Sequence, residues 1–531
     1  MLIPLVICHS LKLFNFHSLY TSPMKKSTLV ILLVGIICYT SWGQTDTDKE
    51  DKKPIPEGEV STTQQSVKIN GATIPLTARA GTMQLRDENN NPIALFGFTS
   101  YTKEVAKDAA PVNRPIIFSY NGGPGSSSYW LHMGVMGPKR IAVNDPTNTP
   151  AAPYKIVNNE FSLLDIADLV MMDPIGTGLS VPIGKSKFED FWGVDQDIRS
   201  ISLFIKQYLI ENGRMNSAKY LLGESYGTFR NAGVMNKLLN DGIALNGVVM
   251  VSAVFDLRTL LFPPNDDMSY IVHFPTYAAT AWYHNKIANK PASLEAFITE
   301  VRNFTEKEYV PALFKGNKLT VEERNALANK LANYSGCSVD FWKKADLRVQ
   351  AGEFFAELLR NEGNTVGRLD SRFKGGNQDL LSQFADYDPQ SSAISPAYTA
   401  GFMHYYYNDL KVNKKLNYMT SAGGREGFKW DWKHEGNMRW GTSAAINTGI
   451  DMAQAMTLDP NVKVLILNGY YDIATVFYGV EYTIDHLGLT NELRNNIIMK
   501  YYEAGHMMYT HQPSLEKFRK DVSEFIISTS K

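Results

Sequence analysis

Cysteine is scarce in this chain, which has only Cys8, Cys38 and Cys337 among its 531 residues. Removal of the export signal that we predict at residues 24–43 would leave Cys337 alone. A single cysteine cannot form an internal disulfide, so the mature fold must be held together by core packing. No histidine pattern is recognisable around Cys337, and we therefore expect it to be a structural residue rather than a catalytic thiol.

The chain also lacks an excess of charge of either sign. Its 53 lysines and arginines nearly balance its 54 aspartates and glutamates, which gives a formal net charge of −1. Without a basic surplus to neutralise phosphates, nucleic acid is not expected as a partner. Charged residues make up only 20% of the chain and hydrophobic residues 44%. This composition predicts a large packed core and excludes a chain that is mostly disordered.

The apolar run at residues 29–37 is shorter than the ~20 residues that a membrane-spanning helix needs. It follows the basic residues Lys25 and Lys26 and precedes small residues at 41 and 43, a pattern typical of a cleaved secretory signal. We predict an upstream extension at residues 1–23, a signal at 24–43 and no membrane span after cleavage. A retained anchor is one alternative. A lipoprotein is a second, although bulky Ile37 precedes Cys38. Export without a disulfide framework favours a bacterial periplasm or exterior.

Composition and periodicity divide the remaining chain into segments. Residues 44–64 are charged and polar, as expected of a solvated linker. Alternating apolar residues between 65 and 101, interrupted by the turn-rich run 87–92, predict antiparallel hairpins. Helix-like segments without strand patterns fill the stretch from 261 to 440, which we interpret as an inserted helical cap. A core in two parts, 65–260 and 441–531, would surround it.

Short apolar runs without alternation predict strands that are buried on both faces of a parallel sheet. The amphipathic stretch at 197–210 is typical of a crossover helix. In such sheets the active site forms at the carboxyl ends of the strands, so the polar residues that follow each run are candidates for function. The runs are 115–120, 168–172, 220–222, 248–251 and 462–467, and the helix-like segments around them are 294–304, 320–332, 347–360 and 442–456.

The segment 223–227 fits the pattern G-x-S-x-G, a sharp strand-to-helix turn that exposes a nucleophilic serine. The pattern also occurs in ordinary glycine–serine turns, but here it follows a buried-looking run and is the only match. A serine nucleophile needs a base and a carboxylate that orients the base. Asp472 follows the last strong apolar run, and His506 follows another. Together with Ser225 they give the order Ser, Asp, His. His486 and His511 fit that pattern less well.

The glycine-rich run at 121–128 follows the first central strand and leaves backbone N–H groups open to a ligand, as an oxyanion hole requires. A phosphate cradle is the alternative, but the Lys-Ser/Thr of a Walker loop is missing. With this run, five segments resemble the serine carboxypeptidase family, in the family's order, over residues of about 90 to 515. The five segments are 121–128, 173–180, 223–227, 468–472 and 505–507.

This resemblance implies an α/β-hydrolase fold, with a mostly parallel central sheet, N-terminal antiparallel hairpins and an inserted helical cap. It also implies a carboxypeptidase that acts on peptides through an acyl-enzyme and needs neither a metal nor a cofactor. In the implied triad, Ser225 is the nucleophile, His506 the general base and Asp472 the acid that orients the base. The N–H groups of Gly123 and Tyr226 would be the oxyanion donors. Asn121, Gly122 and Glu224 would bind the substrate's terminal carboxylate.

Glu224 lies beside the nucleophile and would repel a substrate carboxylate if both were ionised. Burial raises the pKa of a carboxyl, and a protonated glutamate can donate a hydrogen bond to that carboxylate. We therefore hypothesise that peptides bind best at acidic pH. One departure affects this site, because Val135 stands where the family usually has a glutamate that supports the carboxylate-binding pair. His132 is nearby and is interpreted as a packing residue.

Two other functions use the same scaffold. An esterase or acyltransferase would keep the triad and lose only the carboxylate-binding role of Asn121 and Glu224, because fold does not determine substrate. A non-catalytic binding protein would have lost the chemistry altogether. A metallohydrolase fits poorly, because His434 and Glu435 stand without the H-E-x-x-H spacing that places two ligands on one helix face.

Overall fold

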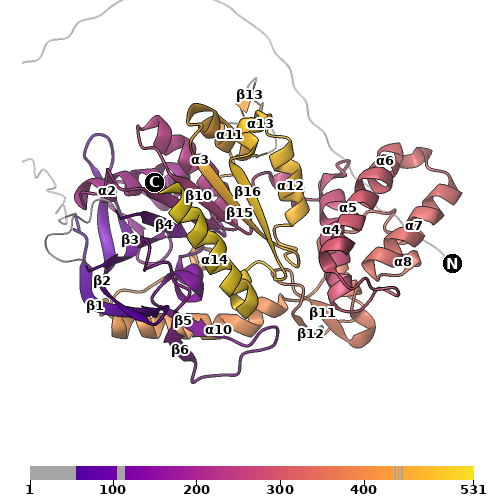
Figure 1. The fold of residues 1–531 in the computed structure, drawn as a ribbon, viewed down its shortest axis with the longest axis horizontal. Helices are drawn as coiled ribbons and strands as arrows, with labels where there is room; N and C mark the ends of the chain where they lie inside the picture. The colour runs from indigo at the N-terminus through magenta and orange to yellow at the C-terminus, as the bar shows by residue number, and fades with distance from the viewer. Residues whose placement is uncertain (1–54, 105–113, 436–437, 440–441, 444–445, 531) are drawn as a thin grey trace, which may run out of the picture. The chain divides into compact units, whose positions relative to one another are not determined.

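The structure, a computed structural model, describes residues 55–104, 114–435, 438–439, 442–443 and 446–530. Ile55–Lys531 form one compact unit (Figure 1). The predicted upstream extension and export signal, and most of the predicted linker, lie outside the described residues.

Within the described residues, ten strands form one mixed sheet (Figure 1). β1, β2 and β3 pair in antiparallel fashion, as predicted for the N-terminal hairpins. β3 pairs antiparallel with β7. From β7 onward the pairs β7–β4, β4–β9, β9–β10, β10–β15 and β15–β16 are parallel. In spatial order the strands are β1 (Val60–Ile69), β2 (Ala72–Arg86), β3 (Pro92–Lys103), β7 (Asp168–Asp173), β4 (Ile116–Tyr120), β9 (Lys219–Glu224), β10 (Gly247–Val251), β15 (Lys463–Gly469) and β16 (Ile497–Tyr502), with β8 (Val181–Pro182) paired to β3.

The central strands are buried on both faces, which explains why their sequences read as continuous apolar runs. Every residue of β4, β7, β9 and β10 is buried. Adjacent side chains of β4 enter different cores: Ile117 packs in the cluster that contains Phe525, and Phe118 in the cluster that contains Phe229. Each fully buried side chain of this size contributes about 1.5–3 kcal/mol. Helices of the core cover the two faces, with α2 (Val194–Glu211), α3 (Tyr226–Asn240) and α11 (Gly449–Leu458) on one and α14 (Gln512–Thr529) on the other.

Helices dominate the segment between β10 and α11 (Figure 1). Most of them enclose a third apolar cluster, which also takes in Tyr470, Tyr471 and Phe477 from the chain that follows β15. This segment therefore packs directly on the loop that carries Asp472. Its elements are α4 (Met268–Tyr283), α5 (Leu294–Phe304), α6 (Val310–Lys315), α7 (Val321–Ser335), α8 (Val339–Lys344), α9 (Ala351–Glu357), β11 (Asn364–Val366), β12 (Lys374–Gly376) and α10 (Pro389–His404).

The remaining elements are short and lie around the sheet. α1 (Tyr129–Leu131) follows the glycine-rich run, and the hairpin of β5 (Lys139–Ala142) and β6 (Lys155–Asn158) lies alongside α10 (Figure 1). β13 (Met438–Arg439) pairs with β14 (Thr442–Ser443), and α12 (Phe477–Asp485) and α13 (Asn491–Arg494) lie between β15 and β16. Within the described ranges, no helix is long and apolar enough to cross a membrane.

Two predicted helices begin later than expected. The helix expected at 442–456 starts at Gly449, because Thr442 and Ser443 pair with β13 instead. The helix expected at 347–360 starts at Ala351, because Leu347 has a φ of +65°, which is incompatible with a right-handed helix. The helix predicted at 294–304 is confirmed with the same ends in α5.

Candidate active site

Ser225 lies on the turn between β9 and α3, partly exposed, with φ +61° and ψ −130°. A positive φ strains a residue with a side chain by ~1–3 kcal/mol. The turn is held by the N–H of Ser225, which donates to the carbonyl of Val251 at 2.9 Å. Glycine is required at 223, because a Cβ there would lie 2.6 Å from the carbonyl carbon of Gly227. The predicted G-x-S-x-G segment therefore forms the sharp turn that exposes a serine hydroxyl.

Asp472 and His506 form a buried pair on the loops that follow β15 and β16. Asp472 Oδ2 lies 2.8 Å from His506 Nδ1, and the aspartate is 0% exposed. The other oxygen, Oδ1, accepts hydrogen bonds from the N–H groups of Ala474 and Thr475, each at 2.9 Å. Burial lowers the pKa of His506, but Asp472 outweighs this effect and the net shift is upward. The carboxylate thus fixes the imidazole and stabilises its protonated form.

Two hydroxyl side chains complete the support of this pair. Ser252, at the end of β10, donates to the carbonyl of His506 at 2.6 Å. Thr475 donates to Asp472 Oδ2 at 2.7 Å and is also within 3.0 Å of the Ser252 carbonyl. Sequence reasoning did not identify either residue, although Ser252 ends a buried strand and Thr475 follows the acid by three positions.

Ser225 and His506 line the same pocket, which has a volume of about 540 Å³. Asp472 lies behind the imidazole, so the structure brings together all three side chains that the sequence assigned to a triad. The wall opposite them is mostly apolar. The other lining residues are Gly123, Pro124, Tyr226, Val254, Leu257, Leu260, Leu261, Arg368, Leu369, Trp432, Ile446, Ala474 and Thr475.

The glycine-rich run approaches the Ser225 turn through positions that have no room for a side chain. A Cβ on Gly122 would lie 2.8 Å from the carbonyl oxygen of Glu224 and also meet the backbone nitrogen of Tyr226. Gly123 has a φ of +108°, a conformation that favours glycine. Both Gly123 and Tyr226 line the pocket beside Ser225. The backbones of both residues therefore lie in the pocket that contains Ser225.

Asn121 and Glu224 form a buried pair next to the serine. Asn121 Nδ2 donates to Glu224 Oε1 at 2.9 Å, and its Oδ1 accepts from the N–H of Leu131 at 3.0 Å. Glu224 is 4% exposed, and burial raises its pKa to about 7. Its second oxygen, Oε2, makes no well-formed hydrogen bond within the described residues, although the Tyr509 side chain faces the carboxyl. A neutral Glu224 can donate from that oxygen to a ligand.

The residues that could support this pair from the neighbouring turn do not do so. Val135 is fully buried in the apolar cluster beneath the sheet. His132 Nε2 bonds the Tyr101 hydroxyl at 2.7 Å, and burial lowers the pKa of His132 to about 3. The histidine is therefore neutral and packed, as the sequence predicted.

A segment from the helical region, residues 368–372, contacts both loops of the Asp472–His506 pair. The N–H of His506 donates to the carbonyl of Leu369 at 2.6 Å, and the N–H of Ile473 donates to the carbonyl of Arg368 at 3.1 Å. One bond comes from His506 itself and the other from the residue that follows Asp472, so the segment constrains both backbones.

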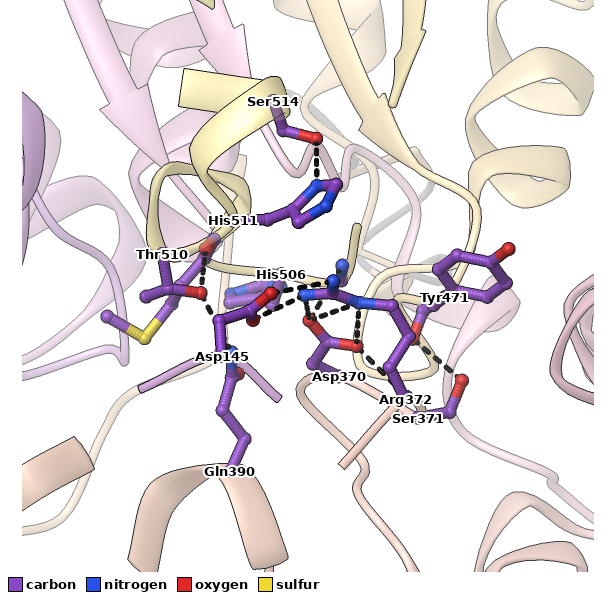
Figure 2. A network of polar contacts seen from close by, with 12 residues as sticks. Asp145, Asp370, Ser371, Arg372, Gln390, Tyr471, His506, Thr510, His511 and Ser514 are labelled. Carbon is purple, nitrogen blue, oxygen red and sulfur yellow. Dashed lines mark hydrogen bonds and ion pairs between the residues drawn. The ribbon is translucent and has the colours of Figure 1, made fainter. Parts of the chain in front are cut away.

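An ion network anchors that segment (Figure 2). The Arg372 guanidinium lies between two carboxylates, 2.6 Å from Asp370 and 2.8 Å from Asp145. Asp370 is fully buried and also accepts from the N–H of Gly505 at 3.0 Å. A Cβ on Gly505 would lie 2.5 Å from the Asp370 Cα. Sequence reasoning missed this network, because its members are distant in the chain and follow no local pattern.

Arg368 brings an unpaired positive charge to the pocket. Its side chain is exposed, and no carboxylate among the described residues forms an ion pair with it. Its charge acts to lower the pKa of His506, which lines the same pocket. Among the residues that line the pocket, it is the only lysine or arginine.

His434, considered above as a metal ligand, is engaged in ion pairs instead. Its Nδ1 lies 2.6 Å from Asp195 and its Nε2 2.7 Å from Asp451. Burial lowers the pKa of His434, but the two carboxylates outweigh it and raise the pKa to about 9. Among the described residues, no group of three or more His, Cys, Asp or Glu side chains is placed to hold a metal ion.

A mostly parallel sheet covered by helices, with a strained serine turn after one strand and an acid and a histidine after two later ones, defines an α/β-hydrolase. The chain belongs to the serine carboxypeptidase family, whose family model, described as "Serine carboxypeptidase", matches residues 75–519. It is therefore a hydrolase of the serine carboxypeptidase type, with a peptidase function.

The first of two similar solved structures shows the same fold. Kex1(Δ)p, a prohormone-processing carboxypeptidase from Saccharomyces cerevisiae, is similar with a TM-score of 0.50 and 18% sequence identity over 85% of this chain and 92% of that chain. A soluble variant of monoglyceride lipase from Saccharomyces cerevisiae gives a TM-score of 0.33 and 12% identity over 84% of this chain and 95% of that chain. Among curated proteins, no relative matches the sequence.

Proposed function

We propose that this protein releases C-terminal amino acids from peptides through an acyl-enzyme on Ser225. The observation that carries the proposal is the pocket shared by the strained Ser225 turn and His506, with Asp472 bonded behind the imidazole at 2.8 Å. Ser225 Oγ attacks the last peptide carbonyl while His506 accepts the hydroxyl proton. His506 then gives that proton to the departing amine, and water repeats the sequence to release the shortened peptide.

The backbone N–H groups of Gly123 and Tyr226 would stabilise the negative charge that develops on the carbonyl oxygen. Such donors contribute most where they are fixed before the reaction begins, and loss of one typically lowers the rate ~10²–10³-fold. The glycines at 122 and 123 support this role, because they let the backbone of the run approach the nucleophile turn.

Terminal-residue specificity would come from Asn121, the N–H of Gly122 and Glu224, which bind the free carboxylate of the peptide. Glu224 is neutral below its pKa of about 7 and can then donate a hydrogen bond. Above that pH it is ionised and repels the substrate carboxylate. We therefore expect peptide binding to be strongest at acidic pH.

An esterase or acyltransferase remains the second candidate function, and one observation favours it. Val135 supplies no acid to support Glu224. Digestion of a mixed peptide library followed by mass spectrometry separates the candidates. Stepwise loss of single residues from the C-terminus supports the carboxypeptidase. Internal cuts, or hydrolysis of esters alone, would contradict it, and a protein without any hydrolytic activity would be a binding protein.

We also propose export to a bacterial periplasm or exterior, on the basis of the signal pattern at 24–43. The lone Cys337 fits a mature protein without disulfides, since it is buried and burial raises its pKa. N-terminal sequencing of protein recovered outside the cytoplasm should begin at Gln44. A mature protein that retains residues 24–43 would contradict the proposal.

A further inference from the structure

Two buried polar atoms beside Ser225 face each other without a well-formed hydrogen bond. Glu224 Oε2 and the hydroxyl of Tyr509 find no partner of good geometry within the described residues, although each influences the pKa of the other. Both side chains are almost completely buried, Glu224 at 4% exposure and Tyr509 at 3%. Leaving a buried polar group unpaired is unfavourable, and native proteins satisfy nearly all of them. A polar ligand bound beside the two would give both of them a well-formed hydrogen bond.

The structure brings Tyr509 to Glu224 through the turn that follows the catalytic histidine loop. Met508–Thr510 form a 3₁₀ turn that carries the Tyr509 ring to Gly134. Gly134 makes room for the ring, since a Cβ there would lie 2.5 Å from Tyr509 Cδ2. The ring thus packs on the residue that precedes Val135, the position that lacks the supporting acid.

The chemistry of Tyr509 suits a donor at this place. Burial raises the pKa of its phenol well above the ordinary value, and the facing Glu224 carboxyl raises it further. The hydroxyl is therefore protonated near neutral pH and can donate one hydrogen bond. On the other side, Asn121 already occupies Glu224 Oε1 at 2.9 Å, so that only Oε2 is open.

We propose that Tyr509 is a substrate-binding residue whose hydroxyl donates to the terminal carboxylate of the peptide, beside the donor Glu224 Oε2, and so takes the place of the acid missing at Val135. The inference rests on the proposed carboxypeptidase function and adds a residue to its binding site. Hydrogen bonds to a charged group are among the stronger ones in proteins. Loss of this one should weaken binding of a free-acid peptide by roughly 10- to 100-fold.

Binding to an inactive enzyme tests the inference without turnover. In the Ser225→Ala background, calorimetry would compare one peptide with a free C-terminus and the same peptide with a C-terminal amide. Adding Tyr509→Phe should weaken binding of the free acid roughly 10- to 100-fold and leave the amide unchanged. Unchanged amide binding also shows that the variant is folded.

Tyr406→Phe is the matched control, because Tyr406 is also a buried tyrosine whose hydroxyl has no partner among the described residues, but it packs beside Asp173. It should alter neither affinity. If Ser225→Ala prefers the free acid and Tyr509→Phe retains that preference in full, the inference is wrong. If Ser225→Ala shows no preference for the free acid, the proposed carboxylate site itself is wrong, whatever Tyr509 does.

Discussion

Replacing Glu224 by glutamine tests whether a neutral carboxyl receives the C-terminus of the peptide. Burial holds the pKa of Glu224 at about 7, above the ordinary value of a glutamate. The protonated form, present below that pH, donates to the substrate carboxylate, and the ionised form above it cannot. In the wild-type protein, recognition of a free C-terminus should therefore fall by about tenfold for each pH unit above ~7.

The assay must separate this titration from that of His506, which has to be neutral to act as a base. Because His506 serves every substrate, its contribution divides out in the ratio of kcat/KM for a free-acid peptide to kcat/KM for the same peptide with a C-terminal amide. That ratio should fall with rising pH in the wild-type protein. In Glu224→Gln, whose amide donates at every pH, the ratio should be independent of pH. A wild-type ratio that stays flat from pH 5 to 9 would refute the reasoning.

Three further predictions follow from contacts around the site. Gly505→Ala places a Cβ 2.5 Å from the Asp370 Cα and should displace the His506 loop, which would lower kcat/KM roughly 100-fold. Steady-state kinetics that match the wild type would show that the contact with segment 368–372 does not position this loop. Arg368→Gln removes a charge that lowers the pKa of His506, so the acidic limb of the pH–rate profile for an amide substrate should move to higher pH, whereas Arg368→Lys should leave it in place. His434 gains its two carboxylate partners on folding, and its pKa rises from ~6.5 in the unfolded chain to about 9. Its stabilising effect is therefore complete below pH ~6.5 and is lost as the pH rises through about 9. Tm should fall over that range in the wild type and fall less in His434→Gln.

The parts of the fold that the sequence predicts are those governed by local patterns. The runs at 115–120 and 220–222 are continuous in apolar residues because both faces of β4 and β9 are buried, and the predicted hairpins before them are confirmed. The serine turn is also recognisable, because its glycines are required by the backbone geometry. The roles assigned to Ser225, Asp472 and His506 stay predictions, although the structure places the three side chains together.

What the sequence could not predict depends on contacts between distant segments. The ion pair of Arg372 joins Asp145 across 227 positions, and Asp370 meets Gly505 across 135. No local periodicity encodes such pairs. Tyr509 is hard to recognise for a different reason: it follows Met507 and Met508 and looks like part of an apolar run. Only the structure shows that its hydroxyl faces Glu224 without a well-formed hydrogen bond.

Covalent labelling tests the role of Ser225 most directly. A fluorophosphonate reacts with a serine that an adjacent base activates, and intact-mass measurement followed by peptide mapping locates the adduct. We expect one adduct, on the peptide that contains Ser225, which Ser225→Ala abolishes and Asp472→Asn slows. An unlabelled wild-type protein, or an adduct that persists in Ser225→Ala, would contradict the proposal that this serine is the nucleophile.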